Sequence, residues 1–250
     1  MDAVWEVYVS QTKYGPAYIS VNSALEANAP LATHPISVNC NLEQLQVDGY
    51  KLPTQTARAK VMLFEKKAKA LIQNEQSHIY AGRVSLGDFT LFNFYSSNGA
   101  ALVNAFKTSK EFSTGFQFRC KAEWDGSWEF YRRTLYPNAL ARNKIENEKI
   151  RNVLGSQGDD GSQRRKVNHF AHFPDSVSLD AFYKHITKTG YKVESRSEKP
   201  DDNGKWSIVF SDDQAPVVMD IWTFNLRATA TKLKGEYSGW ESTVVLRRKK

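Results

Sequence analysis

The sequence contains few of the residues that cross-link a chain or interrupt its regular structure. Among 250 residues there are two cysteines, eight prolines and fourteen glycines. Two cysteines cannot form the disulfide framework of a small secreted domain, and so little glycine and proline excludes collagen-like and low-complexity chains. We expect Cys40 and Cys120 to be reduced and to pack as small core residues.

Long apolar runs are also missing. No segment approaches the roughly 20 consecutive apolar residues of a membrane helix. The first residues, MDAVWEVY, have neither a basic region nor an apolar region of the kind found in signal peptides. We therefore expect a soluble, cytoplasmic protein that does not act on a membrane.

Most enzyme signatures are absent as well. The sequence has no phosphate-binding glycine loop of the G-x-x-x-x-G-K-[ST] type and no G-x-G-x-x-G, G-x-S-x-G or H-E-x-x-H motif. His169 and His172 lie three apart in a strand-like segment, so they should point to opposite faces and not share a metal. The adjacent acids Asp159 and Asp160 lie in loop-like sequence and are expected to be solvated. We expect no catalytic residues, no metal and no cofactor.

What the sequence does contain is enough apolar side chain for a packed core, with 41% hydrophobic and 12% aromatic residues. The glycine-rich segment GSQGDDGSQ begins at Gly155 and resembles a flexible linker. We predict a first domain at residues 1–155, a linker at 156–163 and a second domain at 164–250. The formal charge of +7 divides into +2 for residues 1–160 and +5 for 161–250, where it gathers at the two ends, Arg164–Lys166 and Arg247–Lys250.

Hydrophobic periodicity predicts an α+β protein in both domains. In the first domain it predicts a mixed fold with an antiparallel sheet, with strands at 5–9, 17–21, 35–42, 79–86, 89–95 and 115–124 and helices at 52–73, 99–107, 128–136 and 139–154. In the second it predicts strand 166–173, a helix from Ser176 to Gly190, strands 191–196 and 206–210, a helix from Pro216 to Lys234 and strand 235–246. That βαββαβ order is typical of a ferredoxin-like sandwich.

The segment Gly115–Lys121 and the preceding Thr114 are faintly similar to an RNA-binding strand motif. The basic, small and final aromatic positions of that motif are occupied by Thr114, Gln117 and Lys121. Phe116 and Phe118 are therefore expected to face the core.

The last strand carries the most unusual local sequence, Glu236-Tyr-Ser-Gly-Trp-Glu-Ser-Thr243. A glycine between two large aromatic residues in a strand indicates a bulge or a close approach of backbone. Without a bulge, Tyr237 and Trp240 would point to opposite faces. Ordinary packing of two aromatic residues in a terminal strand explains most of this pattern.

Residues 164–246 resemble the regulator of ribonuclease activity B (RraB) family of ribonuclease E inhibitors. The resemblance rests on Val167-Asn-His169, the helix around Leu179, Gly190-Tyr-Lys-Val193, the long second helix and Glu236–Glu241. It implies the same ferredoxin-like fold and a non-catalytic protein that binds a ribonuclease or its assembly. Members of that family are strongly acidic, whereas this domain is basic, so the fold is carried over more readily than the target.

The first domain is similar to a bacterial family of unknown function, the domain-of-unknown-function family six-nine-five. The shared features are Trp5-x-x-Tyr8, Gly49–Pro53, Gly82-Arg83 with Gly87, Phe92-x-Phe-Tyr95, and Asp125-Gly-Ser-Trp128-x-x-Tyr131 running on to Leu135-Tyr-Pro137. The resemblance implies an architecture and no activity.

Three hypotheses follow from the sequence. The preferred one is a non-catalytic regulator that binds a protein partner, with Glu236, Tyr237, Gly239, Trp240 and Glu241 as contact residues because aromatic residues flanked by charge are typical interface anchors. The alternative is an RNA-binding module that uses basic clusters and exposed sheet aromatics. The third is an enzyme with a site between the two domains, which would need a concave pocket holding polar groups with perturbed pKa values.

Overall fold

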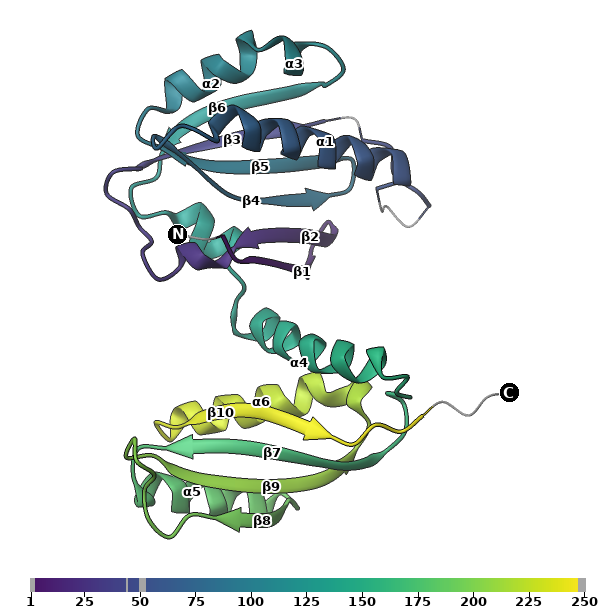
Figure 1. Cartoon of the computed structure of the whole chain (residues 1–250), viewed down its shortest axis with the longest axis vertical. Helices are drawn as coiled ribbons and strands as arrows, with labels where there is room; N and C mark the ends of the chain where they lie inside the picture. The colour runs from purple at the N-terminus through teal and green to yellow at the C-terminus, as the bar shows by residue number, and fades with distance from the viewer. Residues whose placement is uncertain (1–2, 44, 50–52, 247–250) are drawn as a thin grey trace. The chain divides into compact units, whose positions relative to one another are not determined.

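The computed structural model describes residues 3–43, 45–49 and 53–246. It divides into two compact units, Met1–Ala141 and Arg142–Lys250. The units are described separately below (Figure 1). The α+β class predicted for both is confirmed.

The first unit is built on a six-stranded antiparallel sheet in the order β1-β2-β4-β5-β3-β6. All six predicted strands are present: β1 (Trp5–Thr12), β2 (Gly15–Asn22), β3 (Ile36–Leu42), β4 (His78–Leu86), β5 (Phe89–Ser96) and β6 (Phe118–Trp124). Hairpins join β1 to β2 and β4 to β5. Strand β3 enters between β5 and β6, so β1 and β6 are the two edges.

Helices cover one face of this sheet. The first, α1 (Gln55–Ile72), begins at Thr54, whose side chain accepts a hydrogen bond from Ala57 N. With α2 (Gly99–Thr108) and α3 (Lys110–Ser113) it packs on the core face of β3 and β5. Ala57, Val61, Phe64 and Ala68 are spaced by four, three and four residues and form its buried stripe. The opposite face is covered over β2, β4 and β5 by the segments with η1 (Ser23–Leu25) and η2 (Tyr131–Leu135), which contribute Leu25, Trp128, Tyr131 and Leu135.

The two cysteines form a disulfide, so the prediction of two reduced core cysteines is wrong. Cys40 on β3 lies directly opposite Cys120 on β6, and their sulfur atoms are bonded. The sequence could not show this because the two residues are 80 positions apart and only the pairing of β3 with β6 brings them together. The bond ties an edge strand to the interior of the sheet.

Reduction of this disulfide is expected to destabilise the first unit. A cross-link that closes an 80-residue loop limits the unfolded chain and contributes about 2–4 kcal/mol. Urea denaturation of the full chain with and without dithiothreitol measures the difference. The Cys40→Ala/Cys120→Ala variant is the control, because its curve should not respond to the reductant. Superimposable curves for the oxidised and reduced wild-type chain would contradict the prediction.

The second unit contains a four-stranded antiparallel sheet in the order β10-β7-β9-β8. Its elements are β7 (Arg165–Phe173), α5 (Ser176–Lys188), β8 (Lys192–Arg196), β9 (Trp206–Gln214), η3 (Pro216–Val218), α6 (Met219–Lys232) and β10 (Glu236–Ser242). This order of strands is that of the predicted ferredoxin-like sandwich. Figure 1 shows α5 and α6 behind the sheet, and no helix in front of it.

The predicted first domain, residues 1–155, includes almost all of helix α4 (Ala139–Ser156). The compact units instead divide between Ala141 and Arg142, near the start of this helix. Apart from its first turn it belongs to the second unit, where Ile150 and Leu154 pack with Val167, Met219 and Trp240. The predicted linker at 156–163 is an ordered turn. Asp159, expected to be solvated, is buried, and its carboxylate pairs with Arg165 at 2.7 Å. The segment therefore closes the second unit and does not separate two domains.

Candidate protein-binding surface

Strand β10 contains the bulge that its glycine indicated. The register against β7 shifts between Tyr237 and Gly239, which leaves Ser238 as the extra residue. Gly239 has φ +124°, a backbone conformation that favours glycine. The extra residue changes the alternation of side chains, so Tyr237 and Trp240 point to the same face, toward the helices. The side chains of Glu236, Ser238 and Glu241 are exposed.

Tyr237 is held in the core by a buried chain of hydrogen bonds. Its hydroxyl lies 2.8 Å from His169 Nδ1, and His169 Nε2 lies 3.1 Å from Asp212 Oδ1. Because a carboxylate only accepts, Nε2–H donates to Asp212 and the tyrosine hydroxyl donates to Nδ1. Burial raises the pKa of Tyr237 well above its usual value, so this hydroxyl keeps its proton. Tyr237 and His169 are almost fully buried, which makes the arrangement structural and leaves no room for a substrate.

Trp240 is covered by α4. Its indole Nε1–H donates to Asn147 Oδ1 at 2.9 Å. The amide nitrogen of Asn147 donates in turn to Asp220 Oδ1 and Thr223 Oγ1 of α6, both at 2.8 Å. Arg151 Nη1 also donates to Asp220 Oδ1, at 2.9 Å. One polar network thus joins β10, α4 and α6 beneath the sheet.

The face of the sheet opposite the helices has no covering element within the described residues. We call it the open face; it consists of alternate residues of the four strands: Lys166, Asn168, Phe170 and His172 of β7, Lys192 and Glu194 of β8, Ser207, Val209 and Ser211 of β9, and Glu236, Ser238, Gly239 and Glu241 of β10. Asn168 donates to Glu241, and His172 contacts Ser238, which confirms the shared face. Half-buried Phe170 and Val209 lie centrally, with polar and charged residues around them. An apolar centre with a polar rim is the usual anatomy of a protein interface.

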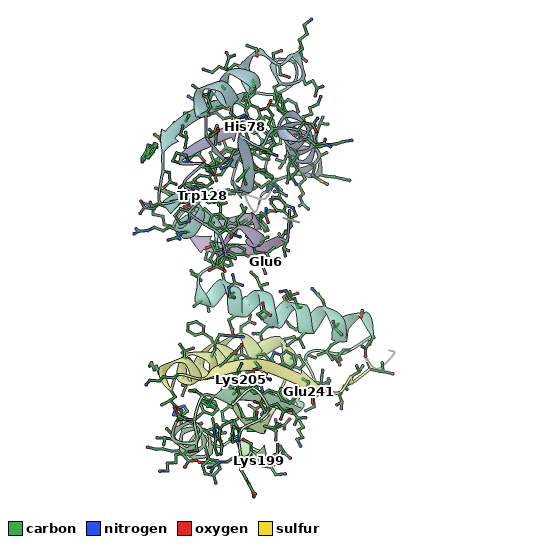
Figure 2. The ribbon with its side chains drawn as sticks, turned by 60° about the vertical axis from the view of Figure 1, so that its left-hand side comes forward. Glu6, His78, Trp128, Lys199, Lys205 and Glu241 are labelled. Atoms are coloured by element: carbon green, nitrogen blue, oxygen red, sulfur yellow. A yellow bond between two sulfur atoms is a disulfide. The ribbon has the colours of Figure 1, made fainter. Side chains whose placement is uncertain are left out.

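Charges of both signs alternate on the open face. Lys166 and Lys192 pair with Glu194, and Lys205 pairs with Glu236 at 3.7 Å. A hydrogen bond from Ser211, together with Lys166, lowers the pKa of Glu194 to about 2. The Glu194 carboxylate is therefore ionised at physiological pH. Because Lys166 and Lys192 both lie beside it, these lysines do not form an unneutralised basic stripe. Figure 2 labels Lys205 and Glu241 in this unit.

The structure divides the five predicted contact residues into two groups. Glu236, Gly239 and Glu241 lie on the open face, where a partner could reach them. Tyr237 and Trp240 are 1% and 5% exposed, which corrects the expectation that their side chains are exposed anchors at the edge of the sheet. The bulge is the physical reason, because it turns both aromatic rings toward the helices.

Sequence reasoning missed the residues that hold this strand in place. Asn143, Asn147, Ile150 and Leu154 follow helical spacing of four, three and four along one face of α4. The helical spacing is visible in the sequence, but two of the four residues are asparagines, so apolar periodicity alone does not reveal this face of α4. Asn143 Nδ2 donates to the backbone oxygen of Asp220 at 2.9 Å.

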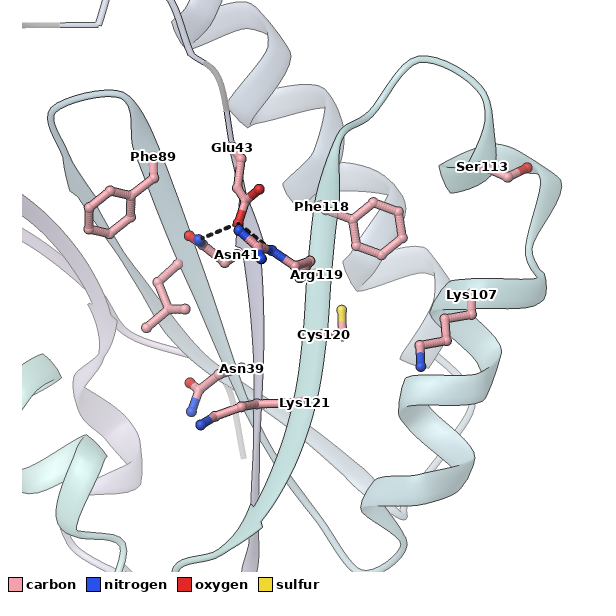
Figure 3. A pocket seen from close by; sticks show the side chains of 11 residues that line it. Asn39, Asn41, Glu43, Phe89, Lys107, Ser113, Phe118, Arg119, Cys120 and Lys121 are labelled. Atoms are coloured by element: carbon pink, nitrogen blue, oxygen red, sulfur yellow. Dashed lines mark hydrogen bonds and ion pairs between the residues drawn. The ribbon is translucent and has the colours of Figure 1, made fainter.

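The first unit contains a concave site, a pocket of about 800 Å³ beside β6. Asn39, Asn41 and Glu43 line it together with Arg119 and Lys121, as Figure 3 shows. Arg119 and Asn41 both contact Glu43 Oε1, Lys121 pairs with Glu123, and Lys107 also lines the pocket. Nothing in this geometry selects a particular ligand.

The remaining sequence candidates are structural. Phe116 and Phe118 pack against the core of the first unit, as expected, so the aromatic residues of the RNA-motif-like segment do not present their rings on an open sheet face. His169 is buried and His172 lies on the opposite face, also as expected. Within the described residues, no three His, Cys, Asp or Glu side chains are grouped to hold a metal ion. In the same part of the chain, no helix combines the length and the apolar character that a membrane span needs.

Each of the two units matches the model of a protein family. Residues 144–242 match the family model of Regulator of ribonuclease activity B, and residues 3–136 match a Family of unknown function, DUF695. The first of these ranges coincides with the second unit and begins inside α4. No curated protein matches the chain.

A comparison with solved structures found a crystal structure that covers most of this chain at low similarity. It is a crystal structure of an unknown protein from Galdieria sulphuraria, which is 14% identical, covers 84% of this chain and 99% of its own, and has a TM-score of 0.24. That score is too low to indicate a shared fold. The family matches are more informative. Because the DUF695 model spans more than half of the chain, the chain belongs to the DUF695 family, and its C-terminal unit is similar to the regulator of ribonuclease activity B family.

Proposed function

We propose that the protein is a non-catalytic regulator that binds a protein partner through the open face of its C-terminal unit, with a ribonuclease or a ribonuclease-containing assembly as the partner. The observation that carries the proposal is the match of residues 144–242 to the regulator of ribonuclease activity B model. The open face supports it, because an apolar centre within a mixed polar rim fits a protein surface. Glu236, Gly239 and Glu241 are the proposed contacts, and the buried rings of Tyr237 and Trp240 hold their strand in place.

The mixed charge of the open face also bears on which ribonuclease surface would fit. An acidic regulator is steered to a basic partner region, whereas this face presents paired lysines and glutamates. A partner surface with alternating charge complements it better than a uniformly basic one. The same pairing argues against RNA as the main ligand, since phosphate binding depends on clustered, unneutralised lysine and arginine.

The cytoplasm is the proposed compartment, because that is where RNA-degrading assemblies act. Cytosolic thiols tend to keep cysteines reduced, so this compartment predicts two thiols at Cys40 and Cys120 in place of the disulfide of the structure. The redox state of Cys40 and Cys120 in the cell therefore reports on the compartment independently of partner binding.

Charge reversal on the open face tests the proposal. A Glu241→Lys variant is expected to weaken binding to a purified ribonuclease assembly from the native host by on the order of tenfold, because it replaces an exposed rim charge. Isothermal titration calorimetry measures the affinity, and cleavage of a fluorescent RNA measures regulation. The control is Glu146→Lys, the same substitution at an exposed position on α4. The proposal fails if the wild-type chain neither binds the assembly at micromolar concentration nor alters its cleavage rate.

A further inference from the structure

Strand β1 has an unusual pattern of exposure for the edge of a sheet. Trp5, Val7 and Val9 are 36%, 68% and 43% exposed, while the alternate residues Glu6 and Tyr8 are half-buried. An edge strand ordinarily places charged or polar residues on its exposed side. Here the exposed side is apolar, and Val7 borders a pocket of about 300 Å³ with Val61 and the exposed Met62 of α1.

Among the residues that the structure describes, none pairs with the outer edge of β1, and the free backbone groups at this edge belong to these same residues. Val4 O accepts a hydrogen bond from Ser23 N, and the register of β1 against β2 continues from this pair. Because hydrogen-bonded pairs alternate in an antiparallel ladder, the even-numbered residues of β1 are the ones that bond to β2. The odd-numbered residues then direct their N–H and C=O groups away from β2, toward the unpaired edge. Residues 5, 7 and 9 therefore combine free hydrogen-bonding groups with apolar side chains on one face.

The opposite edge of the sheet is protected in the usual way. Strand β6 carries the exposed charges of Arg119, Lys121 and Glu123. In β1 the single charged residue is Glu6, which lies on the other face from Val7 (Glu6 is labelled in Figure 2). Within β1 itself, no like charges would therefore oppose one another on the face of Trp5, Val7 and Val9 if two copies of the strand approached.

We propose that β1 is a self-association surface on which two copies of the chain pair antiparallel about a two-fold axis at Val7. In that register Val7 faces Val7 of the second copy in a hydrogen-bonded pair, and Trp5 faces Val9. At these three odd-numbered positions apolar side chains oppose one another on one face of the ladder, which stabilises an antiparallel pair. The proposal is independent of partner binding through the C-terminal unit.

Sedimentation velocity of the full chain tests whether a dimer forms. The short ladder buries less than a standard interface, so we expect a monomer–dimer equilibrium in the micromolar range. Val7→Pro removes the outward N–H while leaving the bonds to β2 intact, as proline permits on an edge strand. It should raise the dimer dissociation constant at least tenfold, whereas the control Val7→Thr retains the dimer.

Cysteine cross-linking tests the register without depending on the proline variant. In the proposed pairing the Cα atoms of two copies of residue 7 lie about 5.5 Å apart, within disulfide range. Two copies of residue 9 lie about 13 Å apart, beyond it. Val7→Cys should therefore form a covalent dimer on mild oxidation, and Val9→Cys should not. A monomer at all concentrations, equal cross-linking at both positions, or assemblies that keep growing with concentration through β1–β6 pairing would overturn the proposal.

Discussion

Replacing Trp240 with alanine lowers the free energy of unfolding of the C-terminal unit by about 3–5 kcal/mol, the usual cost of truncating a buried tryptophan. The ring packs with Leu154, Val167 and Met219, and its loss leaves a cavity at that junction. It also leaves Asn147 Oδ1 without the indole donor that it accepts from at 2.9 Å. Chemical denaturation monitored by amide hydrogen exchange in β7 and β10 measures the change within this unit.

Trp240→Phe separates the two contributions. Phenylalanine keeps most of the apolar contact and removes the hydrogen bond, so the expected cost falls to about 1–2 kcal/mol. If Trp240→Ala leaves the exchange rates of both strands unchanged, the packing described for this residue is incorrect. If Trp240→Ala weakened partner binding, the stability of the unit would have to be measured in the same variant. The side chain is buried and can affect the open face only through its strand.

Removal of Asp159 is expected to have a comparable effect. The side chains of Asp159 and Arg165 are 2% and 7% exposed, and the carboxylate also accepts a hydrogen bond from Val245 N at 2.7 Å. Asp159→Ala leaves the Arg165 guanidinium buried without its counter-charge, which costs about 3–5 kcal/mol. Thermal and urea denaturation of the full chain measure the loss.

The double variant Asp159→Ala/Arg165→Ala decides whether the pair is the cause. Once both charges are gone, no uncompensated charge remains, so the double variant should be more stable than Asp159→Ala alone. Asp160→Ala, a neighbouring acid whose side chain bonds within its own exposed turn, is the control and should cost less than 1 kcal/mol. Equal stability of Asp159→Ala and wild type would contradict the burial of this pair.

The sequence predicted the parts of the fold that depend on local patterns. The alternation of Ile36, Val38, Cys40 and Leu42 located β3, and the four-three spacing from Ala57 to Ala68 located α1. The order of elements in the second unit was sufficient to predict the order of strands in its sheet, because few arrangements of βαββαβ avoid crossed connections.

What could not be predicted depends on contacts between distant residues. Gly239 indicated a bulge, but only pairing with β7 shows that the bulge turns Tyr237 and Trp240 to the same face. The glycine-rich composition around Asp159 predicted a flexible linker. Composition alone could not show that the carboxylate of Asp159 accepts hydrogen bonds from Arg165 and Val245 N, which hold this segment in place. The disulfide likewise required the partner strand of Cys40.

The position of α4 determines where the C-terminal unit can be cut. A fragment that starts at residue 164, at the end of the glycine-rich segment, would lack Asn147, Ile150 and Leu154, and so would leave the ring of Trp240 open to water. A piece of the chain that keeps this unit whole therefore begins no later than Arg142, the first residue of the unit. The glycines that resemble a boundary between domains lie inside that piece.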